Sequence, residues 1–102
     1  YNYSNHKYFS YSIIYNMKIS ELIKILENKI KKNLSVESIN IEDKTYLHKK
    51  HKGHTKDKFH IKIILRSNEL KKLSKIEGSR LIHNIIKDEI KNNIHSIQLQ
   101  IH

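Results

Sequence analysis

Histidine is the residue type in this sequence best suited to chemistry, because the chain contains no cysteine. Eight of the 102 residues are histidines. Three of them, His48, His51 and His54, follow one another at intervals of three residues in a polar segment, and His95 stands by itself near the C-terminus. Neutral imidazole is a borderline ligand that suits iron, zinc and copper. These four histidines are therefore the candidate metal ligands.

Ordinary structural roles compete with metal binding at these positions. Histidines in a lysine-rich segment are commonly solvated, and a single histidine at a strand entrance commonly makes structural hydrogen bonds. A zinc site made of His48, His51 and His54 alone is a weaker alternative, because their spacing differs from the usual ligand pairs and no second shell is visible. Whether these histidines bind a metal or have ordinary structural roles depends on the helices and strands that position them.

The chain is strongly basic. Twenty Lys and Arg against ten Asp and Glu give a net charge of +10, and residues 44–58, with six Lys and one Asp, hold +5 of it. Such a field attracts nucleic acid, anionic membranes or acidic protein surfaces. Lysine is abundant throughout, so the charge only weakly supports a nucleic-acid partner. The candidate nucleic-acid contacts are Lys49, Lys50, Lys52 and Arg80.

Composition also disfavours several classes of protein. Without cysteine, the chain forms no disulfide and offers no thiolate nucleophile or ligand. No apolar run approaches the roughly 18–20 residues that cross a bilayer, so we expect a soluble protein with no membrane partner. The sequence shows no phosphate loop, no spaced carboxylate pair and no nucleophile–base–acid set. We therefore expect a binding protein rather than an enzyme.

One small α+β domain is expected over residues 17–102. Residues 1–16 contain no acidic side chain. They are expected to be either the remnant of an organelle transit segment or a disordered leader ahead of Met17. The first reading implies a mitochondrion or plastid, and the second implies the cytoplasm; both are intracellular.

Hydrophobic periodicity predicts the elements of the first half of the domain. Apolar residues at helical spacing predict a helix from Ser20, as its N-cap, with Glu21 in the first turn. Alternating apolar residues predict two strands, with a long polar loop between them. The predicted ranges are 20–33 for the helix, 36–43 and 59–67 for the strands, and 44–57 for the loop.

The second half adds a helix and a strand. Ser74 and Glu77 form the S-x-x-E pattern of a capping box, which opens a helix that we expect to reach about residue 92. Gly78 inside it is expected to weaken the helix by up to about 1 kcal/mol against alanine. Alternation predicts a last strand over 97–101.

The predicted order is α-β-β-α-β. A hairpin joins the first two strands, and a right-handed helical crossover makes the third parallel to the second. Both helices are expected on one face of the sheet, leaving Lys62, Gln98 and Gln100 on a solvated face. With this topology, His95 lies at the same end of the sheet as the 44–57 loop, so it and a loop histidine can converge.

Several motifs now resemble a known family. They are DKTYLHKKHKG (Asp43 to Gly53), His60 before Ile61, Ser67 three residues before Leu70, and IHSI (Ile94 to Ile97). In order and spacing they are similar to the BolA-like family's acidic–hydroxyl loop with H-x-x-H-x-G, its H-F step, its S-x-x-F step and its I-H-A-L. The resemblance covers Met17 to His102.

One segment departs from the family pattern. Where the family usually has R-H-R in the second helix, this chain has Gly78, Ser79 and Arg80, so only the last arginine remains. That helix has been associated with nucleic acid in relatives, so the change weakens a DNA-binding interpretation.

The resemblance implies a fold like a type II KH domain and a partnership with monothiol glutaredoxins of the CGFS type. In such pairs a [2Fe–2S] cluster bridges the two proteins, and the partner supplies its cysteine and a bound glutathione thiol. By the same resemblance, this chain supplies His95 and His51, with His48 and His54 as alternates. The expected function is that of an adaptor in iron–sulfur cluster assembly and trafficking, monomeric or weakly dimeric alone.

A nucleic-acid-binding module of the KH type is the alternative. It rests on the charge and the fold class. Against it, the only two glycines, Gly53 and Gly78, cannot form a G-x-x-G clamp. Residues 60–102 also contain no Phe, Tyr or Trp on which bases would stack.

Overall fold

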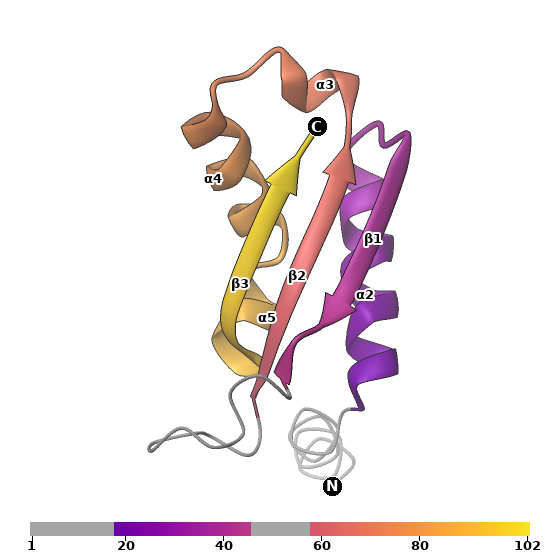
Figure 1. Cartoon of the computed structure of the whole chain (residues 1–102), viewed down its shortest axis with the longest axis vertical. Helices are drawn as coiled ribbons and strands as arrows, with labels where there is room; N and C mark the ends of the chain where they lie inside the picture. Colours follow the sequence, from indigo (N-terminus) through magenta and orange to yellow (C-terminus); the bar gives the residue numbers. More distant parts are fainter. Residues whose placement is uncertain (1–17, 46–57) are drawn as a thin grey trace, which may run out of the picture.

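The computed structural model describes residues 18–45 and 58–102. Within these ranges the elements follow the predicted order, except that a short helix is added after β2 and the second predicted helix is divided into two (Figure 1). They are α2 (Ile19–Asn33), β1 (Ser38–Asp43), β2 (Phe59–Arg66), α3 (Asn68–Lys71), α4 (Lys75–Ile85), α5 (Lys87–Asn92) and β3 (Ile94–Ile101). The leader expected over 1–16 and most of the 44–57 loop lie outside the described residues.

The three strands form one mixed sheet in the order β1-β2-β3. β1 and β2 are antiparallel, with Ile41 opposite Ile63, and β2 and β3 are parallel, with Ile63 opposite Leu99. The predicted hairpin and parallel crossover are thus confirmed. Because the third strand is parallel to the second, both begin at the same end of the sheet (Figure 1).

The core lies between the sheet and helices that pack on one of its faces, behind the sheet in Figure 1. Its buried side chains include one stripe of α2, alternate positions of β2, one residue of α4 and the residue between α4 and α5: Leu22, Leu26, Ile30, Ile61, Ile63, Leu65, Ile82 and Ile86. Burying each such side chain contributes about 1.5–3 kcal/mol. On the opposite face Gln98 and Gln100 are exposed and Lys62 is half-buried, as expected.

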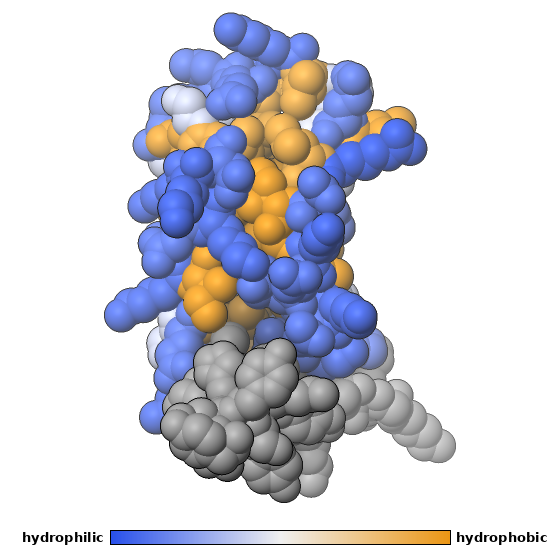
Figure 2. Space-filling view, turned by 180° about the vertical axis from the view of Figure 1, so that it is seen from behind, coloured by the Kyte–Doolittle hydropathy of each residue, from blue (hydrophilic) through white to orange (hydrophobic). Residues whose placement is uncertain are grey.

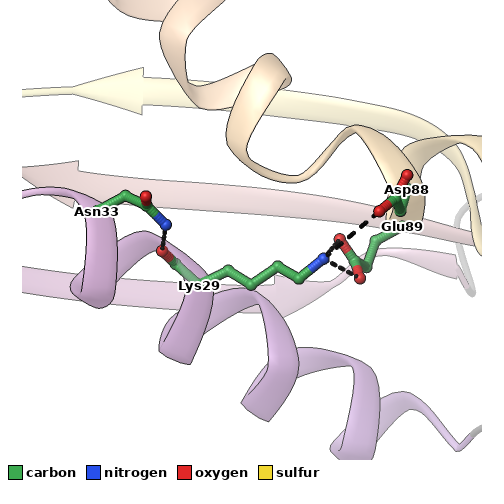
Figure 3. Close-up of polar contacts among 4 residues, drawn as sticks. All are labelled: Lys29, Asn33, Asp88 and Glu89. Atoms are coloured by element: carbon green, nitrogen blue, oxygen red, sulfur yellow. Dashed lines mark hydrogen bonds and ion pairs between the residues drawn. The ribbon is translucent and has the colours of Figure 1, made fainter.

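Figure 2 shows the helix-covered side, where polar side chains flank apolar ones over the coloured part of the surface. An ion pair ties two helices together: Lys29 of α2 lies 2.8 Å from a carboxylate oxygen of Glu89 in α5 and 4.0 Å from one of Asp88 (Figure 3). Among residues 18–45 and 58–102, no helix has both the length and the apolar composition needed to cross a membrane.

The prediction that Ser20 caps the first helix is wrong. The helix begins at Ile19, and Lys18, which holds the N-cap position, makes no side-chain capping bond. The amides of Glu21 and Leu22 donate to the Lys18 carbonyl, which places Ser20 inside the first turn. Ile19 packs against the core, and this contact favours a helix that starts one residue earlier.

The single helix predicted up to residue 92 is divided in two. Ile86, with φ −109° and ψ 25°, leaves the helical region between α4 and α5. Its side chain is fully buried, and its amide still donates to the Ile82 carbonyl. Packing of Ile86 into the core therefore accompanies the change of direction that brings the chain back to the sheet.

The structure explains why a glycine occupies position 78 inside a helix, which the sequence alone does not. It is buried in α4, and a Cβ added there would lie 3.3 Å from Cδ1 of Ile101 in β3. The glycine therefore permits close packing of α4 on the end of β3. The capping box of Ser74 and Glu77 that opens this helix is present as predicted.

Candidate functional site

His95 lies at the end of the sheet where β1 ends and β2 begins. Ile94, the first residue of β3, pairs with Phe59, the first residue of β2. The root of the hairpin loop is at the same end, since the Lys44 amide donates to the His60 carbonyl over 2.7 Å. His95 is exposed and is not buried against the helices. The parallel crossover thus places His95 where the sequence predicted.

An irregularity in the sheet singles out His95. Phe59 pairs with Ile94, but His60 pairs with Ser96, so His95 is an extra residue in β3 between two consecutive pairs. Such bulges bend the strand locally and re-aim a side chain, and they recur near functional sites. β3 also starts three residues earlier than the predicted strand over 97–101, and this extension brings His95 and Ser96 into the sheet.

A second imidazole lies beside His95. The ring of His60 has its centroid 4.9 Å from that of His95, and the two planes are tilted by 52°. His60 is buried, with 5% of its surface exposed, whereas His95 is exposed. Nδ1 of His60 is 2.6 Å from Oγ of Ser96. The site therefore has an inner imidazole held by a hydroxyl and an outer imidazole open to solvent.

The root of the loop is fastened to the same histidine. A carboxylate oxygen of Asp43 accepts hydrogen bonds from the amide, at 2.9 Å, and from the hydroxyl of Thr45. Oγ1 of Thr45 in turn accepts from the His60 amide at 3.2 Å. The acidic–hydroxyl pair before the loop histidines thus fixes where the loop leaves β1 relative to His60.

The described donors suit a metal or cluster only in part. In residues 18–45 and 58–102 no group of three or more His, Asp or Glu side chains is arranged to hold a metal ion. Two imidazoles are borderline donors that fit iron, zinc or copper, but the chain has no thiol to complete an iron–sulfur site. A metal or cluster bound here would therefore need further ligands from beyond the described residues.

The other predicted site residues fall into two groups. His48, Lys49, Lys50, His51, Lys52 and His54 lie outside the described residues. Arg80 is exposed on α4, two residues after Gly78, which packs on Ile101 at the opposite end of β3 from His95. The structure therefore does not bring Arg80 to the histidine site.

From the sequence, His60 was identified only as part of a motif, and its contact with His95 was not predicted. A signal was available. The first residues of two neighbouring parallel strands lie side by side. Since His60 and His95 are both near the start of their strands, they are expected to be close together. The bulge that shifts the register by one residue was not predictable from the alternation.

The comparisons with known proteins agree with this fold. The family model described as BolA-like protein matches residues 30–102. The DNA-binding transcriptional regulator BolA of Haemophilus influenzae is 26% identical over 77 residues, covering 76% of this chain and 72% of the relative.

Two solved plant structures share the architecture. The BolA domain of SufE1 from Arabidopsis thaliana superposes with a TM-score of 0.65 at 24% identity, and BolA1 from the same plant with 0.66 at 23% identity. Each match covers 76% of this chain and 86% of the other chain. Since the family model matches most of the sequence and the described fold is that of BolA domains, this chain belongs to the BolA-like protein family.

Proposed function

We propose that this chain is an adaptor in iron–sulfur cluster assembly and trafficking, which acts without turnover. It binds a monothiol glutaredoxin of the CGFS type and contributes imidazole ligands to a [2Fe–2S] cluster that bridges the two proteins. The observation that supports this most is the position of His95, exposed at the end of the sheet where the histidine-bearing loop has its root.

The ligand chemistry is complementary between the partners. The glutaredoxin supplies two thiolates, one from its cysteine and one from bound glutathione. This chain supplies His95 and His51, with His48 and His54 as alternates for the second position. Two thiolates and two imidazoles resemble Rieske-type ligation, which raises the reduction potential above that of all-thiolate clusters. Because this chain has no cysteine, the partner is required for stable cluster binding.

The positive charge of this chain favours its association with an acidic partner protein. The segment 44–58 carries +5 and joins the sheet at the end where His95 lies. A basic segment attracts an acidic partner surface and raises the association rate, and salt screens this attraction.

The test is reconstitution of the mixed complex. The chain is combined with a CGFS glutaredoxin, iron, sulfide and glutathione, and the visible absorption and circular dichroism are recorded. The wild-type complex is expected to differ from the glutaredoxin alone, and His95→Ala and His51→Ala are each expected to change the spectrum. His83→Ala, which removes a histidine from α4, is the matched control and is expected to leave it unchanged.

Two results would contradict the proposal. If the wild-type chain does not alter the spectrum of the glutaredoxin cluster, the adaptor function is wrong. If His95→Ala and His51→Ala both leave the mixed spectrum unchanged, the ligand assignment is wrong. A change with His48→Ala or His54→Ala but not with His51→Ala identifies the alternate second ligand.

Nucleic-acid binding is a second candidate, because the Haemophilus influenzae relative is named a DNA-binding transcriptional regulator. The net charge of +10 and the exposed Arg80, with Lys49, Lys50 and Lys52, also favour it. Binding from charge alone is sequence-independent and weakens steeply with salt. Fluorescence anisotropy with duplexes of different sequence distinguishes the cases: a strong sequence preference at physiological salt supports a regulator, and its absence contradicts it.

A further inference from the structure

The paired histidines at the start of β2 and β3 have different environments. His95 is exposed on a bulge, and its neighbour His60 is buried. We propose that His60 is a positioning residue, which holds the His95 imidazole in the orientation needed to bind the cluster and does not itself bind it. This inference rests on the proposed function.

His60 is fixed from three sides. Its ring nitrogen Nδ1 lies 2.6 Å from the Ser96 hydroxyl. Its amide donates to Oγ1 of Thr45, and its carbonyl accepts from the Lys44 amide. The ring therefore has a set position relative both to β3 and to the root of the loop.

His95 needs such a neighbour. An exposed histidine has several staggered side-chain rotamers available, and restricting them costs conformational entropy when a ligand is bound. The His60 ring, tilted by 52° at a centroid distance of 4.9 Å, lies in the range in which aromatic rings pack favourably. This contact restricts the His95 ring before the cluster arrives.

The same contacts connect the two regions that supply ligands. Asp43 and Thr45 tie the beginning of the loop to the backbone of His60, and the His60 ring contacts His95. His60 thus lies between the loop root and the exposed imidazole. Ligand geometry in metal sites is commonly maintained by such supporting contacts, which lock the rotamers of the ligands themselves.

The first experiment uses the chain alone, so it does not depend on any partner. Three-bond NMR couplings report the χ1 rotamer of His95. One dominant rotamer is expected in the wild-type chain and averaged couplings in His60→Ala. His60→Phe, which retains an aromatic ring against His95, is expected to stay close to wild type. His83→Ala is the matched control, because Nδ1 of this α4 histidine also makes a hydrogen bond, donating to the Ser79 carbonyl at 2.7 Å.

The second experiment uses the complex with a CGFS glutaredoxin and the bridging cluster. Loss of the cluster is expected to accelerate roughly 10- to 100-fold in His60→Ala, the usual effect of removing a residue that supports a metal ligand. Pulsed electron paramagnetic resonance of the reduced complex is expected to keep both imidazole nitrogen couplings with altered magnitude. Unfolding midpoints in urea, measured for the same variants, separate loss of the fold from loss of positioning.

Several outcomes overturn the inference. Unchanged His95 couplings in His60→Ala, or already averaged couplings in the wild type, remove the positioning role. Loss of one nitrogen coupling in the complex makes His60 a ligand, and the proposal is then also wrong. A wild-type glutaredoxin mixture without a bridging cluster refutes the proposed function instead, and the NMR result on the free chain distinguishes that failure from this one.

Discussion

The imidazole rings of His60 and His95 have their centroids 4.9 Å apart, although the two residues belong to different strands. They meet because β2 and β3 are parallel and begin at the same end of the sheet. An antiparallel third strand would have placed the start of β3 at the other end, beside Arg66. The parallel crossover between β2 and β3 is therefore what brings the exposed histidine to the root of the loop.

The root of the loop is expected to depend on Thr45. Thr45→Val keeps the shape of the side chain but removes the oxygen that accepts from the His60 amide and donates to Asp43. We expect a loss of about 1 kcal/mol, as for a typical hydrogen bond, and faster hydrogen exchange of the His60 amide. Amide exchange by NMR tests this, with Asp43→Ala as the second variant. An exchange rate equal to wild type in both would refute the anchoring role.

Ser67 is expected to matter for stability more than other serines. It is fully buried, its hydroxyl donates to the Ser35 carbonyl at 2.7 Å, and it accepts from the Leu70 amide at 3.2 Å as the cap of α3. Ser67→Ala removes both bonds within the core, so we expect a loss of about 1–3 kcal/mol. Urea unfolding measures it, and exposed Ser38→Ala is the control. Equal midpoints for the two variants would contradict this role.

The capping box predicts a pH dependence. The pKa of the Glu77 carboxyl lies below its usual value of 4.5, first because the Ser74 backbone amide donates to it and second because of a bond with the Ser74 side chain. A lowered folded-state pKa contributes stability above pH 4.5 that is lost as the pH falls through the folded value. Wild type is therefore expected to exceed Glu77→Gln in stability at neutral pH, with the difference shrinking in acid. A constant difference from pH 7 to pH 3 would exclude this contribution.

Gly78 offers a test of packing against helix propensity. Gly78→Ala is expected to raise stability by less than about 1 kcal/mol, since alanine favours the helix by up to that amount. The gain is reduced because Cδ1 of half-buried Ile101 must move away from the new methyl group. In an Ile101→Val background, which lacks that carbon, the gain is expected to be larger. Thermal or urea unfolding of the wild type, the two single variants and the double variant measures these gains in stability. An equal or smaller gain in the Ile101→Val background would mean that a contact other than Ile101 opposes the alanine.

The ion pair between α2 and α5 is expected to contribute more than the surface pairs. Glu89 has only 11% of its side chain exposed, and its bond with Lys29 joins two helices (Figure 3). Glu89→Gln is expected to cost about 1.5–3 kcal/mol, the range for hydrogen bonds to charged groups. Glu27→Gln is the control, since its pair with Lys31 lies along one exposed helix surface and is expected to contribute about 0.3–0.5 kcal/mol. Similar losses of stability in Glu89→Gln and Glu27→Gln would contradict the larger contribution expected for the Lys29–Glu89 pair.

The sequence by itself determined the order of the elements and the end of the sheet at which His95 lies. Helical spacing, the capping box and strand alternation act over a few residues, so they can be read without the fold, and a helical connection between two strands of one sheet predicts that they are parallel. The helix start was misplaced by one residue at Ser20, because packing of Ile19 against the core outweighs a local capping preference.

Only the tertiary structure decided the contacts between distant segments. The bulge at His95, its contact with His60 and the ion pair of Lys29 with Glu89 all depend on register and packing. The turn at Ile86 is of the same kind, since burial of that side chain accompanies the break between α4 and α5. Such features are set by how whole elements fit together, and alternation along one strand or one helix does not encode them.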